Sequence, residues 1–199
     1  MIKTCPVAYA PRRWRTRTAL MGLLLVAGSW VMAADTTEMV FDPASWRLVT
    51  DGVMGGVSKG RLVADESAGR DCMQLSGQVS TANNGGFIQA AADLPAAAAA
   101  RLGGYDGLRV TLRGNRETYN IHLRTADLWL PWQSYRASVT VTPDWQSFDL
   151  PFATFEPYKT RKTLRPDRLQ RVGIVAIGRD FEADVCIGEV GFYRSAGAD

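Results

Sequence analysis

Residues 107–124 have the sequence GLRVTLRGNRETYNIHLR, in which apolar and polar side chains alternate over two successive runs. Side chains of a β-strand point alternately to its two faces, so this period of two predicts two strands that are each buried on one face. Pairing the runs as a hairpin, with a turn at residues 114–117, places all apolar side chains on one face. A slip of one residue would mix both faces. The polar face would then hold Arg109, Arg113, Asn120, His122 and Arg124.

Similar short alternating runs recur between turn residues along the chain, and helical periodicity is nearly absent. Strands are predicted at residues 39–41, 46–50, 60–64, 72–79, 86–91, 107–113, 118–124, 135–141, 146–151, 171–177 and 184–193. Residues 95–102, PAAAAARL, predict one short crossover helix, because alanine favours helices and proline suits a first turn. This pattern predicts an all-β sandwich formed by a single domain over residues 35–199.

The first 34 residues contain five basic side chains and no acidic one, followed by the apolar run ALMGLLLVAG at residues 19–28. This layout predicts a signal peptide over residues 1–34, cleaved after Ala33 or Ala34, and export to the periplasm or the exterior. An uncleaved anchor is less well supported, because the 16 residues from 19 to 34 are fewer than the roughly 20 that span a bilayer. A mitochondrial transit peptide would be amphipathic instead of containing a compact apolar block.

The predicted leader changes the charge and the cysteine count of the mature chain. It holds 5 of the 23 Lys and Arg residues and none of the 20 acids, so its removal changes the net charge from +3 to −2. Nucleic acid is therefore not an expected partner. Cys72 and Cys186 remain, and an even pair in an exported chain forms either one disulfide or two buried thiols. The sequence leaves both alternatives open.

Two glycine-rich segments, DGVMGGVSKG at residues 51–60 and VSTANNGGF at residues 79–87, predict tight turns or the close approach of a ligand or partner. With GLRVTLRG, YNIHLRT, YRASVTV, WQSFDLPFATFEP and VCIGEVGFYR, they resemble in order the complex I intermediate-associated protein 30 family, from about residue 41 to residue 194. The resemblance implies a galactose-binding-domain-like jelly roll. It also implies an assembly-factor role, since eukaryotic members are chaperones of respiratory complex I assembly on the matrix side. The predicted leader places this chain across a membrane from that compartment.

Catalytic and metal-binding patterns are sparse. His122 is the single histidine and no G-x-S-x-G elbow occurs, so an enzyme using His122 is only the second alternative. Cys72, Cys186 and His122 lack the spacing of a zinc site, and no cofactor is expected. A structural calcium ion at Asp180, Glu182 and Asp184 stays open, because such alternating carboxylates occur in calcium loops.

Binding is better supported, because LWLPWQ at residues 128–133 places two tryptophans in a long loop. These tryptophans either recognise a ligand or fold back over the core. We expect an exported, non-catalytic binding or assembly-factor domain that recognises a protein partner or a small polar ligand through loops and a polar sheet face. The first alternative is glycan recognition like that of carbohydrate-binding modules. The predicted binding residues are Asp51, Asn83, Asn84, Asn120, His122, Arg124, Trp129, Trp132 and Tyr135.

Individual roles follow from the chemistry of these side chains. Asp51, Asn83 and Asn84 would fix loop geometry or bind ligand polar groups. Arg124 would offer a bidentate fork to an anionic group, and the aromatic side chains would supply contact area. The mature domain is not expected to span a membrane, and the sequence leaves its oligomeric state open.

Overall fold

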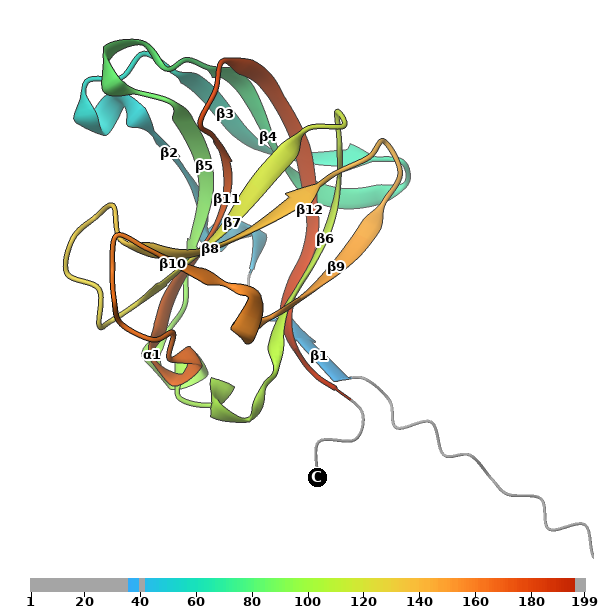
Figure 1. The fold of residues 1–199 in the computed structure, drawn as a ribbon. Coiled ribbons are helices and arrows are strands. Elements are labelled where there is room, and N and C mark those ends of the chain that lie inside the picture. Colours follow the sequence, from blue (N-terminus) through green and yellow to red (C-terminus); the bar gives the residue numbers. More distant parts are fainter. Residues whose placement is uncertain (1–35, 40–41, 196–199) are drawn as a thin grey trace, which may run out of the picture. The chain divides into compact units, whose positions relative to one another are not determined.

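Two antiparallel six-stranded sheets packed face to face form the domain in the computed structural model, which describes residues 36–39 and 42–195 (Figure 1). The signal peptide predicted at residues 1–34 lies outside the described residues. The first sheet has the order β3-β4-β12-β6-β9, with β1 also pairing with β12, and the second has the order β10-β8-β7-β11-β5-β2. The predicted all-β jelly-roll sandwich is therefore confirmed.

The strand bounds agree closely with the alternating runs. The first sheet consists of β1 (Thr36–Met39), β3 (Lys59–Ser67), β4 (Arg70–Val79), β6 (Gly107–Gly114), β9 (Gln146–Pro151) and β12 (Phe181–Arg194). The second consists of β2 (Trp46–Thr50), β5 (Phe87–Asp93), β7 (Thr118–Thr125), β8 (Ser134–Thr140), β10 (Glu156–Tyr158) and β11 (Leu169–Ile177). The one α-helix within residues 42–195 is α1 (Ala96–Ala99), and 3₁₀ turns include η2 (Asp51–Met54) and η3 (Ala82–Asn84).

Two strands differ from the prediction. β1 shares only Met39 with the run expected at 39–41, and residues 40 and 41 lie outside the described part. β10 is not predicted at all, because it has three residues and a central proline, Pro157. Proline lacks a backbone donor and suits only an edge strand, which is the place of β10. The alternation thus identifies the longer strands and misses this short edge.

The hairpin predicted from residues 107–124 is wrong. β6 pairs with β12 and β9, whereas β7 pairs with β8 and β11 in the other sheet. The apolar sets of both strands are fully buried, as predicted, but they enter the core from opposite sheets; they are Leu108, Val110 and Leu112 on β6 and Tyr119, Ile121 and Leu123 on β7. The single polar face expected there is consequently divided. Arg109 and Arg113 lie on the outer face of the first sheet, and Asn120, His122 and Arg124 lie on that of the second.

Cys72 on β4 and Cys186 on β12 form a disulfide, with their Cα atoms 5.5 Å apart. The structure thus selects one of the two alternatives that the sequence leaves open. Both side chains are buried, at 7% and 4% exposure. No helix among the described residues is long and apolar enough to cross a membrane.

Candidate functional site

A buried carboxylate joins the two glycine-rich segments. Asp51 is fully buried and accepts hydrogen bonds from Ser58, through its backbone N at 3.1 Å and its Oγ at 2.5 Å. It also accepts from the backbone N atoms of Gly86 and Phe87, at 2.6 and 3.2 Å. Burial opposes ionisation, but the hydrogen bonds from Ser58, Gly86 and Phe87 outweigh it and hold the pKa of Asp51 below its usual value. Asp51 therefore fixes loop geometry.

The close approach to Asp51 explains the glycines. A Cβ atom at Gly56 or Gly85 would overlap the Asp51 carboxyl group. Asn83 and Asn84 have left-handed backbones, with φ of 56° and 59°, and their exposed side chains lie in the η3 turn beside Gly85. These segments are thus turns built around a carboxylate.

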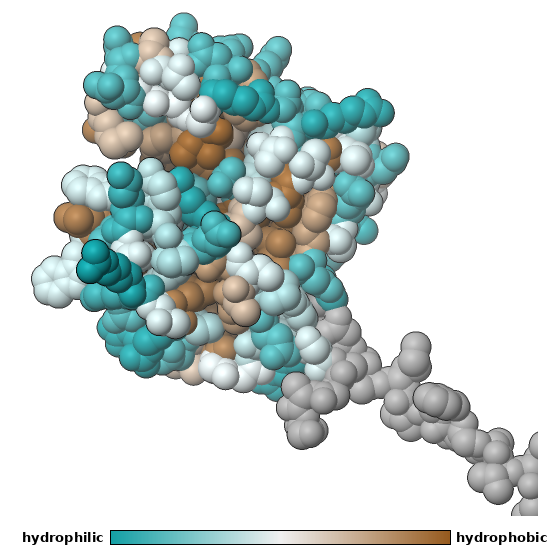
Figure 2. Space-filling view, viewed as in Figure 1, coloured by the Kyte–Doolittle hydropathy of each residue, from teal (hydrophilic) through white to brown (hydrophobic). Residues whose placement is uncertain are grey.

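A cleft of about 710 Å³ lies on the outer face of the second sheet. Central strands supply its floor, which includes Gln89, His122 and Val175. On one side it is bounded by the η2 turn, with Val53 76% and Met54 58% exposed. The opposite side is formed by the loop after β7 and by β10, and includes Pro131, Trp132 and Tyr158. Figure 2 shows a hollow between the region of η2 and the loop after β7, where apolar surface is visible beside polar side chains.

Two small residues follow His122 across the neighbouring strands of the floor. His122 pairs with Gly173 of β11, which pairs in turn with Ala91 of β5. A Cβ atom at Gly173 would overlap the Gln89 side chain, so the absence of that atom lets the Gln89 amide lie across the floor. The cleft therefore has apolar and aromatic side chains along its two sides and polar groups on its floor.

Hydrogen bonds hold the tryptophan loop in place. Arg124 Nη1 donates to the carbonyl oxygens of Leu130, Pro131 and Gln133, at 2.9, 2.8 and 2.5 Å. The Gln133 Oε1 accepts from the backbone N atoms of Trp129 and Leu130, both at 3.1 Å. These hydrogen bonds attach the loop to β7 through Arg124 Nη1 and also connect residues within the loop.

Both tryptophans of the loop are exposed, so the alternative that they fold back over the core is wrong. Trp132 is 54% exposed and lines the cleft. Trp129 is 86% exposed and is not among the residues that line it. The two side chains therefore offer a matched comparison between the cleft and its surroundings.

Arg136 and Tyr158 form a stacked pair at the cleft. The guanidinium carbon of Arg136 lies 3.4 Å from the centroid of the Tyr158 ring, which is a cation–π contact. Arg136 Nε also donates to Ser134 Oγ at 3.0 Å. Neither member of this pair was predicted as a binding residue, and Tyr158 belongs to the unpredicted strand β10.

His122 is half-buried, and its Nε2 atom is buried without a hydrogen-bond partner among the described residues. Burial and, to a lesser extent, the positive charge of Arg136 lower the pKa of His122 to about 3. The imidazole is therefore neutral at ordinary pH. No Asp or Glu is found among the described residues that line the cleft, so none of them supplies the carboxylate that orients a catalytic histidine.

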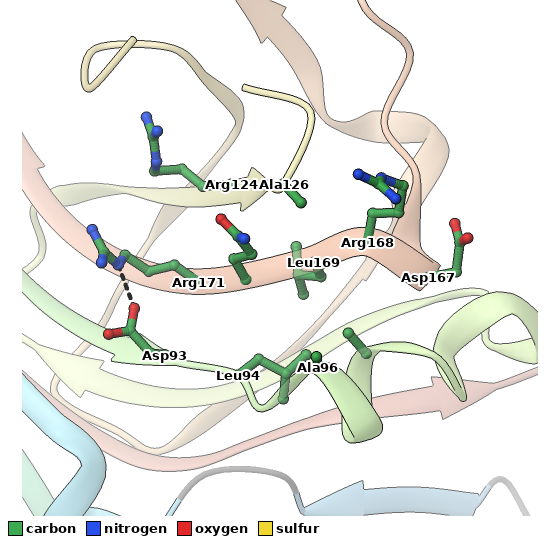
Figure 3. A pocket seen from close by; sticks show the side chains of 11 residues that line it. Asp93, Leu94, Ala96, Arg124, Ala126, Asp167, Arg168, Leu169 and Arg171 are labelled. Atoms are coloured by element: carbon green, nitrogen blue, oxygen red, sulfur yellow. Dashed lines mark hydrogen bonds and ion pairs between the residues drawn. The ribbon is translucent and has the colours of Figure 1, made fainter. Parts of the chain in front are cut away.

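A second hollow of about 580 Å³ adjoins the cleft and shares Arg124 and Arg171 with it. In Figure 3, Arg171 points toward Asp93, and its Nε lies 2.6 Å from the Asp93 carboxylate. Arg168 is also paired, with Asp127 at 2.8 Å. Most charged side chains of this hollow are thus paired within the protein, and the larger cleft is the better candidate site.

Of the nine predicted binding residues, His122, Arg124 and Trp132 line the cleft. Asn120 is half-buried on the same sheet face, next to His122 in the alternation of β7, but is not among the lining residues. Tyr135 is 1% exposed and points into the core, so the contact role predicted for it is wrong. Its neighbour on β8, Arg136, takes the outward position.

Several lining residues were not predicted from the sequence: Val53, Met54, Gln89, Arg136, Tyr158 and Arg171. The alternation itself holds a signal for three of these, since Gln89, Arg136 and Arg171 are polar at outward positions of strands. Val53 and Met54 lie within the first glycine-rich segment. The signal available in the sequence is a pair of large apolar residues in a predicted turn, where side chains tend to be exposed.

No group of three or more His, Cys, Asp or Glu residues that could hold a metal occurs in the described part of the chain. In the segment considered for calcium, Asp180 Oδ1 accepts from the Thr81 backbone N at 2.6 Å and from its Oγ1 at 2.7 Å. Asp184 Oδ1 accepts from Gln74 Nε2 at 3.0 Å. These carboxylates bind different neighbours.

The sandwich has a jelly-roll fold, which it shares with carbohydrate-binding modules of known structure. A family 11 module from Clostridium thermocellum, solved with a beta-1,3-1,4-mixed-linked tetrasaccharide, matches with a TM-score of 0.65 and 11% identity, over 81% of this chain and 98% of the module. A family 30 module of a cellulosomal cellulase from the same organism matches with a TM-score of 0.54 and 14% identity, over 82% of this chain and 99% of the module. At these identities the likeness concerns the fold.

The particular family follows from the sequence. The chain belongs to the family described as Complex I intermediate-associated protein 30 (CIA30), which matches residues 35–185, so the resemblance noted above is confirmed. Comparison with curated proteins finds no match. An agarase shares the fold with a TM-score of 0.55 and 9% identity, over 82% of this chain and 25% of the enzyme.

Proposed function

We propose that the protein is a non-catalytic binding domain that holds a sugar chain in the cleft on its second sheet. The observation that supports this most directly is the placement of exposed Trp132 and Tyr158 opposite Val53 and Met54 over a floor with polar groups. A pyranose ring has apolar faces and hydroxyl edges, so it needs an aromatic or apolar wall together with hydrogen-bonding groups. The Gln89 amide on the floor supplies such a group, beside the neutral imidazole of His122.

The fold supports the same proposal by analogy, because a structural neighbour was solved with a tetrasaccharide. The lack of a carboxylate among the described lining residues supports a binding role over hydrolysis, which commonly uses two carboxyl groups.

Affinity electrophoresis against a panel of neutral and acidic polysaccharides, followed by calorimetry with the retarding polymer, tests this function. We expect Trp132→Ala to weaken binding about tenfold, equivalent to about 1.4 kcal/mol of lost aromatic contact. Trp129→Ala removes another exposed tryptophan of the same loop, outside the cleft lining, and should change affinity less than twofold. Absence of retardation by every polymer, or equal effects of the two substitutions, contradicts the proposal.

A protein partner is the second candidate, because Trp129 and Leu130 are 86% and 43% exposed and are not among the cleft-lining residues. Exposed apolar side chains on a fixed loop are typical of protein contacts. Crosslinking in the native cell distinguishes the candidates. A recurrent partner that is lost with Trp129→Ala but retained with Trp132→Ala would support the second one, and the reverse pattern would contradict it.

We also propose that the domain acts after export. The leader-like residues 1–34 support this, as does the Cys72–Cys186 disulfide, since such bonds persist in oxidising compartments. Intact mass measurement of the protein from its host should give a chain starting at Ala34 or Asp35. A chain that retains residues 1–34 in the cytoplasm contradicts the proposal.

A further inference from the structure

The cleft has an excess of positive charge. Its lining includes Arg124, Arg136 and Arg171, and the described residues that line it include no Asp or Glu. This excess is local, because residues 35–199 together have a net charge of −2. A charge excess confined to one groove of an acidic domain favours ligands of opposite sign at that groove.

One of the three arginines already has a carboxylate partner within the protein. Arg171 Nε lies 2.6 Å from Asp93, and the same carboxylate lies 2.6 Å from Arg47 Nη1. Figure 3 shows Arg171 directed to Asp93, while Arg124 on the neighbouring strand points away from that carboxylate. Asp93 is shared with Arg47, so Arg171 is partly neutralised and already has a carboxylate partner.

The other two arginines are half-buried, and neither takes part in an ion pair within the described residues. Arg124 is bound to loop carbonyl oxygens, and Arg136 to Ser134 Oγ and the Tyr158 ring. These contacts hold the guanidinium groups in place but do not neutralise them. Burial lowers the pKa of both groups, and for Arg124 the nearby Arg171 adds to this effect, yet arginine stays protonated.

A partly desolvated charge without a counter-ion destabilises its surroundings, so it gains free energy when a ligand supplies that counter-ion. The planar guanidinium fork fits a carboxylate in a bidentate manner. Because the Tyr158 ring and Ser134 already hold Arg136, little side-chain entropy remains to be lost on binding. The cleft thus contains a preorganised carboxylate-binding group beside an aromatic wall.

We propose that the sugar chain bound in this cleft contains uronic acid units, whose carboxylate pairs with the guanidinium of Arg136 while the ring contacts Trp132. This inference rests on the proposed function of the cleft. It adds the ligand class, an acidic saccharide, and assigns Arg136 as the residue that distinguishes it from a neutral one.

Calorimetry with the purified protein at low ionic strength tests the inference. The probes are tetramers of β-1,4-mannuronate, β-1,4-glucuronate and α-1,4-galacturonate, each compared with its own methyl ester, with cellotetraose as a neutral β-1,4 chain. We expect at least one acid to bind tenfold or more tightly than its ester. Arg136→Gln should reduce this ratio to about twofold, and Arg136→Lys should give an intermediate ratio. Arg61→Gln removes an equal charge from an exposed position on the other sheet and should leave the ratio unchanged.

The outcomes separate this inference from the function on which it rests. If the esters or cellotetraose bind as tightly as the acids, the acidic ligand class is overturned, but the proposal of sugar binding stands. An acid preference that survives Arg136→Gln, in a variant with wild-type thermal stability, overturns the role of Arg136. Sodium acetate or sulfate that competes at the concentration of the tetramer shows a site for free anions and overturns the saccharide assignment. If no tetramer and no polysaccharide of the larger panel binds, the proposed function itself fails.

Discussion

His122 links the chemistry of the cleft to the pH dependence of stability. Its pKa is about 3 in the folded chain and about 6.5 when unfolded. Between these values the unfolded chain binds a proton that the folded chain does not, so stability falls as the pH falls from 6.5 toward 3. Above pH 6.5 both states are neutral at this residue and the effect vanishes. Carboxylates titrate mostly below pH 5, so the window from 6.5 to 5 isolates His122.

We expect the free energy of unfolding in urea to fall by about 1.5 kcal/mol between pH 6.5 and 5. His122→Gln removes the titrating group and should make the stability nearly independent of pH in this window. Because the chain has one histidine, its imidazole NMR signal needs no assignment. A titration of that signal with a midpoint near 6.5 in the folded protein would contradict the prediction.

At the residue scale, the sequence predicts outward polar side chains better than it predicts contacts between them. His122 and Arg124 are identified because they alternate with buried neighbours on β7. The pair of Arg136 with Tyr158 is missed because β8 and β10 come together only through the sheet order. Asp51 is expected to fix loop geometry or bind a ligand, and its burial depends on donors from both glycine-rich segments.

At the scale of elements, the two glycine-rich turns depend on one buried carboxylate. Replacing Gly56 by alanine would force the new Cβ against Asp51, which is held by four hydrogen bonds. We expect Gly56→Ala to lower the free energy of unfolding by about 2 kcal/mol, as overpacking of a tight site does. Gly103→Ala is the matched control, because its Cβ would have no neighbour within 4 Å, and it should change stability by less than about 0.5 kcal/mol. Equal urea midpoints for the two variants would show that the turn adapts freely.

Residues 107–125 show what an alternating pattern predicts about a strand and what it does not predict. β6 and β7 bury their apolar faces in one core whether they lie side by side or in opposite sheets. The short connection between them crosses from one sheet to the other, where the backbone N of Gly114 donates to Thr142 O and that of Asn115 to Asp184 O. Strands that are distant in sequence, such as β12, decide which neighbours β6 and β7 have in their sheets. The alternation within residues 107–125 contains no information about those distant strands.

At the scale of the whole molecule, the two outer faces differ in kind. The first sheet includes paired side chains, such as Arg109 with Asp149 at 2.5 Å and Arg70 stacked on Trp145 at 5.3 Å. The second sheet has the cleft, with unpaired cations and exposed aromatic groups around it. Fold class and most strand bounds follow from alternation alone, whereas this asymmetry requires the sheet order that puts β6 and β7 in different layers.

The disulfide should raise the temperature up to which the domain, and with it the cleft, stays folded. Cys72 and Cys186 are 114 residues apart in sequence, so their bond closes most of the domain into one loop and restricts the unfolded chain. Closing a loop of this size contributes roughly 5 kcal/mol in the chain-entropy model. At about 2 to 4 °C per kcal/mol for a domain of this size, its loss should lower the Tm by about 10 to 20 °C.

Differential scanning calorimetry of the wild-type protein and of the Cys72→Ala/Cys186→Ala variant, with and without reductant, measures this contribution. Reductant should lower the wild-type Tm to that of the variant and leave the variant unchanged. Sugar affinity at 20 °C should stay the same in all four samples, because the bond lies on the first sheet and the cleft on the second. A wild-type Tm that does not respond to reductant, after thiol titration proves the bond open, would contradict the entropic role. A loss of affinity with the bond would instead show that the two sheets are coupled across the core.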